Sequence, residues 1–147
     1  MAFLKSLDIT GSALTAERYR ADIILQNIAH ANTTRTPGGG PYTRKQVVYE
    51  EKPLSFQSHF RHACMLNKRQ TSRGGVKVQQ MVDSINEFKP VYDPNHPDAD
   101  ADGYVWYPNV DTTEEMADLM AASLSYDANL TALNVVKAMI NKSISLK

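Results

Sequence analysis

Residues 111–147 read DTTEEMADLMAASLSYDANLTALNVVKAMINKSISLK. Apolar side chains recur here at alternating steps of three and four residues, with Ser123 and Lys137 as polar interruptions: Met116, Leu119, Tyr126, Leu130, Leu133, Ile140 and Ile144. This spacing predicts an amphipathic helix from Thr113 to Ile144. Thr112 and Glu115 have the spacing of a capping box, which marks its start. At ~1.5 Å per residue the helix is about 45–50 Å long and needs a partner of similar length.

Residues 1–32 provide that partner, because they repeat the same spacing. The positions concerned are Leu4, Leu7, Gly11, Leu14, Arg18, Ala21, Leu25, Ile28 and Asn32. Further apolar residues such as Ile23 and Ile24 widen the stripe, so we expect this helix to have more than one neighbour. It should end between Asn32 and Thr36, because the sequence Pro-Gly-Gly-Gly-Pro that follows cannot continue a helix.

The middle of the chain has short β-like runs. The candidate strands are 42–50, 76–82, 88–92 and 104–107, while residues 56–71 fit no pattern. We therefore predict an α+β protein in which long N- and C-terminal helices pair as a coiled coil and enclose a small β-rich insert. The expected boundaries are 1–36, 37–110 and 111–147.

Composition excludes several classes of protein. The net charge is zero, which argues for neither a nucleic-acid nor a membrane-surface partner. No apolar run approaches the ~18–20 residues that span a bilayer, and the N-terminus lacks the pattern of a cleaved secretory signal. Cys64 is the single cysteine, so an intramolecular disulfide is excluded and a small buried thiol is expected.

Charge is unevenly distributed along the chain. Residues 52–82 contain six lysines and arginines and no acid, whereas residues 83–118 contain ten acids and one lysine. The two stretches are solvated faces or complementary surfaces within one subunit, or else they are surfaces that meet between neighbouring subunits. Both interpretations remain open from the sequence.

No set of residues for catalysis, metal binding or cofactor binding emerges. Residues 98–103 reproduce the D-x-D-x-D-G opening of a calcium loop, but Asn109 stands where the bidentate glutamate is required. We expect an acidic turn there rather than a cation site. Two long helices around a small insert indicate a self-assembling structural subunit. The alternative is a soluble coiled-coil adaptor that dimerises through its terminal helices; a small enzyme would lack the residues to carry its chemistry.

Several motifs also resemble one protein family. Residues 22–34 follow the pattern D-x-x-x-x-N-I-A-N-x-x-T through Asp22, Asn27 and Asn32, with His30 where the pattern has asparagine. Residues 36–42, 91–105, 107–110 and 115–129 are similar to further stretches of the same family. The pattern is typical of the bacterial flagellar axial proteins, the rod and hook family, and the chain is most similar to the proximal rod subunits of the basal body.

The resemblance implies a non-enzymatic subunit of the proximal rod, whose terminal helices form the inner tube of a drive shaft. It implies export without a cleaved signal through the flagellar type III apparatus, and assembly in the periplasm. The implied partners are copies of the chain and other axial proteins, namely FlgB, FlgF, FlgG, FliE and the MS ring, with no nucleic acid, small-molecule substrate or cofactor.

We expect the assembly interface to lie along the two stripes. Its predicted residues are Leu4, Leu7, Leu14, Leu25, Asn27, Ile28, Asn32, Met116, Leu119, Tyr126, Asn129, Leu130, Leu133, Ile140 and Ile144.

Overall fold

The computed structural model describes residues 2–53, 60 and 74–145, with side chains from residue 5 onward. Cys64 and the unassigned stretch 56–71, apart from Phe60, lie outside the described residues. The elements are α1 (Ala2–Ala29), β1 (Lys45–Glu51), β2 (Val76–Asp83), β3 (Lys89–Tyr92), β4 (Tyr104–Tyr107) and α3 (Thr112–Ser145). This order confirms the predicted α+β fold of two long helices around a small β insert.

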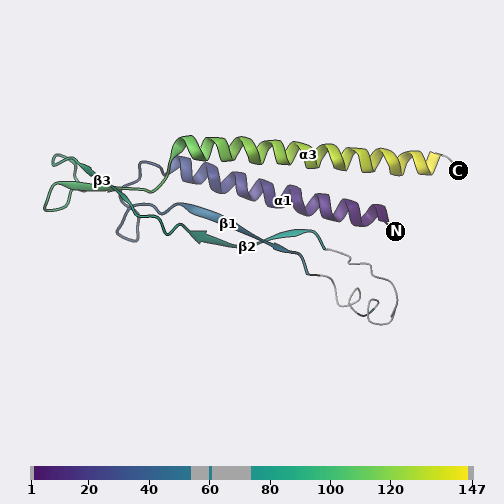
Figure 1. Cartoon of the computed structure of the whole chain (residues 1–147), viewed down its shortest axis with the longest axis horizontal. Coiled ribbons are helices and arrows are strands. Elements are labelled where there is room, and N and C mark those ends of the chain that lie inside the picture. Colours follow the sequence, from purple (N-terminus) through teal and green to yellow (C-terminus); the bar gives the residue numbers. More distant parts are fainter. Residues whose placement is uncertain (1, 54–59, 61–73, 146–147) are drawn as a thin grey trace.

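The two helices lie side by side and run in opposite directions, so that the N- and C-terminal ends of the chain are neighbours (Figure 1). Helix α1 ends at Ala29, a few residues before the predicted range, because the chain turns through residues 30–32. The Tyr42 amide then donates to the Thr33 carbonyl at 3.2 Å and brings the chain back beside the helix end. Asn32 therefore lies beyond α1.

The predicted capping box at the start of α3 is wrong. Asp111 caps the helix instead, because its Oδ1 accepts a hydrogen bond from the Thr113 amide at 2.9 Å. The same bond lowers the pKa of the Asp111 carboxyl. The backbone amide of Glu115 donates to the Asp111 carbonyl, whereas a capping box would direct it to the Thr112 side chain. The Glu115 side chain makes its contacts elsewhere, with Asn27 and Arg44.

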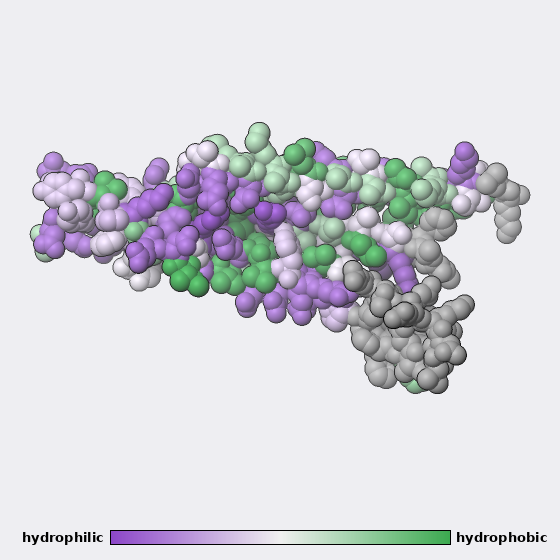
Figure 2. Space-filling view, in the orientation of Figure 1, coloured by the Kyte–Doolittle hydropathy of each residue, from purple (hydrophilic) through white to green (hydrophobic). Residues whose placement is uncertain are grey.

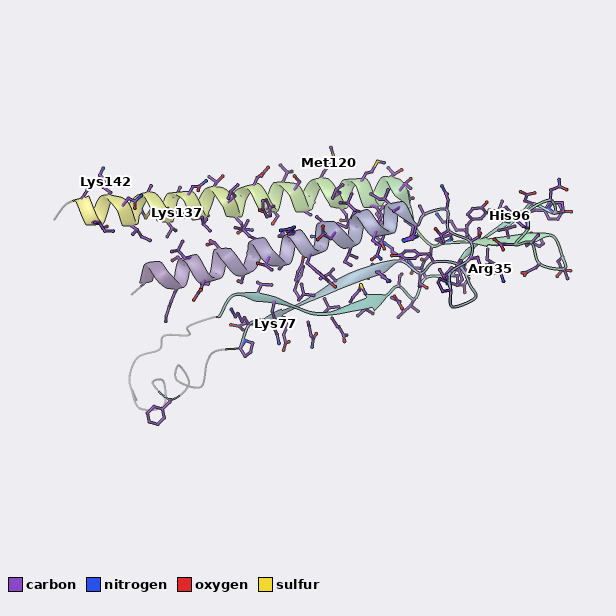
Figure 3. The ribbon with its side chains drawn as sticks, turned by 180° about the vertical axis from the view of Figure 1, so that it is seen from behind. Arg35, Lys77, His96, Met120, Lys137 and Lys142 are labelled. Carbon is purple, nitrogen blue, oxygen red and sulfur yellow. The ribbon has the colours of Figure 1, made fainter. Side chains whose placement is uncertain are left out.

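Strands β1 and β2 form an antiparallel ribbon that packs on α1. The register shifts between Val48 and Tyr49, where β2 carries one additional residue. Figures 1 and 3 place the ribbon on the side of α1 that faces away from α3. Helix α1 is thus the middle of three layers, which confirms that it has more than one neighbour.

Strands β3 and β4 form a second antiparallel pair beyond the ends of the helices. The acidic run 98–103 lies in the loop between them, and Gly103 has a φ of 79° that favours glycine. Asp98 accepts a hydrogen bond from the Thr34 hydroxyl at 2.8 Å, and Asp100 accepts one from the Trp106 indole at 2.6 Å. These carboxylates belong to an acidic turn that is tied to its surroundings.

Few side chains are buried. The buried hydrophobic residues are Ala16, Ile23, Ile24, Tyr42, Val105, Val110 and Ala122. They line the contacts of α1 with its neighbours and the base of the β3–β4 pair. None of the helices in the described part of the chain has the length and apolarity that crossing a bilayer requires.

Candidate assembly interface

A buried polar junction joins α1, the segment before β1 and the start of α3. Its centre is Asn27, whose side chain is 1% exposed. The Asn27 Oδ1 accepts hydrogen bonds from the Lys45 amide at 3.0 Å and the Tyr42 hydroxyl at 2.9 Å. Its Nδ2 donates to the Lys45 carbonyl at 2.9 Å and to Glu115 at 3.1 Å. All the hydrogen-bonding capacity of this amide is used inside the junction.

The second part of the junction is an ion pair. Glu115 is 1% exposed and lies at the start of α3, where its Oε1 accepts from the Arg44 Nε at 2.5 Å. Arg44 also reaches Glu114 at 3.3 Å and Asp118 at 3.6 Å. Asp118 in turn pairs with Arg20 of α1 at 3.3 Å. The charges of α3's first turns are therefore neutralised by arginines from α1 and from the segment that follows it.

Asn109 closes the junction on the side of the β insert. Its Oδ1 accepts from the Arg44 amide at 3.0 Å, and its Nδ2 donates to the Asn86 carbonyl at 2.9 Å. The ring of His30 stacks on Tyr42, with 4.8 Å between the ring centroids. Both strand ribbons are thus tied to the same end of the helix pair.

The environment of the junction keeps the Tyr42 phenol protonated and the Arg44 guanidinium charged, as their contacts require. Burial raises the pKa of the Tyr42 phenol, helped by the charges of Asp83 and Glu115, so its hydroxyl remains a donor. Burial by itself lowers the pKa of Arg44, but the hydrogen bond and charge of Glu115 outweigh it and raise the pKa overall. A buried ion pair is stable only when its remaining donors and acceptors are satisfied, as they are here by Asn27 and Asp118.

The outer side of α3 is apolar as well. Met120 and Leu124 are each 71% exposed, and Met116, Val135 and Met139 are also exposed. Steps of four residues place Met116, Met120 and Leu124 on one ridge, while Ala122 is buried against α1 on the other side. Met120 projects away from α1 in Figure 3, and hydrophobic side chains run along α3 in Figure 2. One face of α3 thus pairs within the subunit and another remains open.

The predicted interface residues divide between these environments. Asn27 is in the junction, and five residues are partly covered by the subunit itself. These are Leu7, Leu14, Ile28, Leu119 and Leu133. Asn129 and Ile140 are also partly covered, and the Asn129 amide donates to the Ser125 carbonyl. The exposed members are Leu25, Asn32, Met116, Tyr126, Leu130 and Ile144. The side chain of Leu4 lies outside the described residues.

Sequence reasoning missed most members of the junction. Tyr42 and Arg44 fell in the predicted strand 42–50, Glu115 was assigned to a helix cap, and Asn109 was considered only as a position of the calcium-loop pattern. Only the asparagine of the N-I-A motif pointed to the site. A buried partner for an acid in the first turn of a helix has no local signal, because Arg44 lies 71 residues away from Glu115 in the chain.

Four of the ten acids in the stretch 83–118 pair with arginines that precede the basic stretch. Asp98 pairs with Arg35 at 3.6 Å, while Glu114, Glu115 and Asp118 pair with Arg44. In the basic stretch, Lys77 pairs with Glu50 at 2.9 Å across the β1–β2 ribbon. Arg61, Lys68, Arg69 and Arg73 lie outside the described residues. In the described part of the chain, no ion pair joins the two stretches.

Known proteins are similar in sequence to the region of α3 and to the chain over nearly its whole length. A family model described as the C-terminal region of flagellar basal body rod FlgEFG proteins matches residues 101–146. A flagellar basal-body rod protein FlgC of Bacillus subtilis is 40% identical, over 99% of each chain. The protein of the same name from Salmonella typhimurium is 41% identical over 99% of this chain and 98% of the relative. That of Borreliella burgdorferi is 35% identical over the same shares.

Proposed function

Because this chain belongs to the family of the flagellar basal-body rod protein FlgC, and is a structural rod subunit of the flagellum, we propose that it builds the proximal part of the rod. In this role it transmits torque from the motor ring to the distal rod and hook. Its site of action is the basal body. Assembly takes place in the periplasm after export through the type III apparatus.

The observation that carries this proposal is the apolar face of α3 that remains open after α3 has paired with α1. A helix that is apolar on two sides needs a neighbour on each side, because exposed apolar area costs ~25 cal/mol per Å² relative to burial. Met116, Met120 and Leu124 form that open face. In an assembly of repeated contacts, the helix pair of the next subunit covers it and a tube of helices results.

The predicted interface residues then have two tasks. Those partly covered within the subunit hold α1 on α3, and the exposed ones contact neighbouring subunits. The neighbours are copies of the chain and other axial proteins, with FlgB, FlgF, FlgG, FliE and the MS ring as the proposed partners. Neither the stripes nor the junction calls for a small-molecule ligand.

The junction suits a part that carries torque. Three hydrogen bonds of Asn27 with Tyr42 and Lys45, and the ion pair of Arg44 with Glu115, connect the helix pair to the β insert. Directional polar contacts specify one angle between packed elements more narrowly than apolar contacts do. We propose that the junction keeps the insert at a fixed angle to the helical tube when the shaft turns.

The test is to charge the open face of α3 without touching its contact with α1. The double variant Met120→Asp with Leu124→Asp should unfold at the same urea concentration as the unaltered chain but form no rods in electron micrographs at high protein concentration. The matched control is Asn134→Asp with Asn141→Asp, which adds the same charge at exposed polar positions of α3. Rods from the first variant, or discrete dimers from the unaltered chain, would contradict the proposal.

A further inference from the structure

The β3–β4 pair presents an exposed aromatic face. The register pairs Tyr92 with Tyr104 and Pro90 with Trp106, so these four side chains share one side of the ribbon. Tyr92 is 65% exposed, Tyr104 44% and Trp106 43%. The two tyrosine rings meet edge to face at 5.4 Å, and the Trp106 indole is held by Asp100. Such rigid aromatic side chains are the groups that anchor protein interfaces.

A second surface of suitable character lies on the other part of the molecule. It is a groove of about 350 Å³ between α1 and the β1–β2 ribbon. Ala16 and Tyr19 line it from α1, and Val76 and Val78 line it from β2. Its other lining residues are Ser12, Thr15, Lys52 and Lys77. The groove thus combines apolar side chains with two hydroxyl groups and two lysines.

The charges of the two surfaces are opposite. The loop between β3 and β4 contains Asp93, Asp98, Asp100 and Asp102 and no lysine or arginine. Arg35 pairs with Asp98, so part of this charge is neutralised locally. Lys77 shares its charge with Glu50, but that pair is exposed and therefore weak. Opposite potentials on two surfaces steer their encounter and set their orientation.

The shape of the subunit prevents the two surfaces from meeting within one copy. The β3–β4 pair lies beyond the end of the helices at which α1 stops, whereas the groove lies beside the middle of α1 (Figure 1). Figure 3 shows the same separation, with His96 of the loop at one end and Lys77 toward the other. A contact between two different patches is heterologous, and repeating it produces an open helical assembly when the rotation between subunits does not close a ring.

We propose that the aromatic face of the β3–β4 pair of one subunit seats in the apolar groove between α1 and β2 of a second copy of this chain. The aspartates of the loop then lie near Lys52 and Lys77 of that copy. This contact rests on the proposed self-assembly of the chain, and adds an outer connection to the one made by the helices.

The experiment uses full-length chains with one cysteine each, made by adding Tyr104→Cys or Thr15→Cys to a Cys64→Ser background. Thr15 lines the groove, and Tyr104 belongs to the aromatic face. The two chains are assembled together at high concentration, oxidised, and separated without reducing agent. A heterologous contact gives disulfide-linked dimers from the mixture and none from either chain alone, since the cysteines meet only in the mixed pair. A chain with both cysteines should give a ladder of multimers.

The matched control mixes the Tyr104→Cys chain with a Val135→Cys chain, whose cysteine is exposed on α3. We expect at least tenfold less dimer from this mixture. Rods that form normally but yield no excess of the Tyr104–Thr15 dimer would overturn the head-to-tail contact and leave the proposed function intact. Absence of rods from the Cys64→Ser chain without added cysteines, with electron microscopy as the readout, would instead overturn both.

Discussion

Asn27 acts within this fold much as a neighbouring strand acts in a sheet. Its amide accepts from the backbone amide of Lys45 and donates to the carbonyl of the same residue, so the chain entering β1 pairs with a side chain of α1. A primary amide is the side-chain group that offers both a donor and an acceptor in one plane. Aspartate has nearly the same shape but lacks the donor, so an Asn27→Asp substitution tests the donor with little change in packing.

The first prediction is that Asn27→Asp destabilises the chain by at least about 3 kcal/mol at neutral pH. The substitution removes the donor to the Lys45 carbonyl and places a carboxylate where Nδ2 now lies 3.1 Å from Glu115. Urea unfolding of the full chain measures the change. The control is Asn32→Asp, an exposed asparagine of the same motif, which should stay within about 0.5 kcal/mol. Equal stability of the two variants would contradict the role given to the junction.

Among the secondary-structure elements, α1 has the most demanding position because it packs on both sides. Its approach to β2 is close at Gly75, whose φ of 94° already disfavours other residues. A Cβ at Gly75 would collide with the Ser12 side chain. The Ser12 Oγ accepts from the Val76 amide at 3.1 Å and donates to the Ile9 carbonyl at 2.7 Å. The ribbon is therefore held to the helix by the hydrogen bond between Val76 and Ser12, and this bond forms because Gly75 has no side chain.

The second prediction compares two glycines with positive φ. Gly39 has a φ of 85° and open space around it, so Gly39→Ala should cost only the backbone strain, about 1 kcal/mol. Gly75→Ala adds the collision with Ser12 and should cost about 2–4 kcal/mol. Thermal unfolding and amide hydrogen exchange of β2 measure both effects. If the two variants are equally stable, the contact of α1 with β2 is looser than described.

The molecule as a whole is an elongated layer structure with charge separated along its length. The acids of the β3–β4 loop lie at one end (Figure 1), and Lys77 of β2 lies far from them (Figure 3). Within the described residues the ion pairs use Arg20, Arg35 and Arg44 for the acids and Glu50 for Lys77. Each of these ion pairs is made within the subunit, and contact of the two stretches between subunits stays a prediction.

The third prediction is that assembly slows as the salt concentration rises above about 0.15 M, where the screening length is ~8 Å. Asp102→Lys alone or Lys52→Glu alone should slow assembly and reduce its salt dependence, and the two together should restore much of the rate. Light scattering against salt concentration measures these rates, with circular dichroism to show that the helices are unchanged. A double variant no faster than either single variant would speak against charge pairing between the two ends.

Local patterns in the sequence were sufficient for the kinds of the elements and for most of their bounds, although α1 ends at Ala29 rather than between Asn32 and Thr36. The step of three and four residues placed α3 within one residue of its observed start and end, and short β-like runs located the four strands of the described residues. These features depend on residues a few positions apart, so no knowledge of distant contacts is needed. The resemblance to flagellar rod proteins likewise rested on short motifs that can be read directly.

Only the tertiary structure decided which side of each helix is used and what lies at the junction. Helix α3 is apolar on two faces, and periodicity cannot say which of them packs on α1, since either would satisfy the same spacing. The partner of Glu115 is a residue 71 positions away, and Asn27 meets Lys45 only after the chain has reversed. Whether a polar residue is buried depends on non-local contacts that satisfy its hydrogen bonds, because burial without such partners costs more than exposure to water.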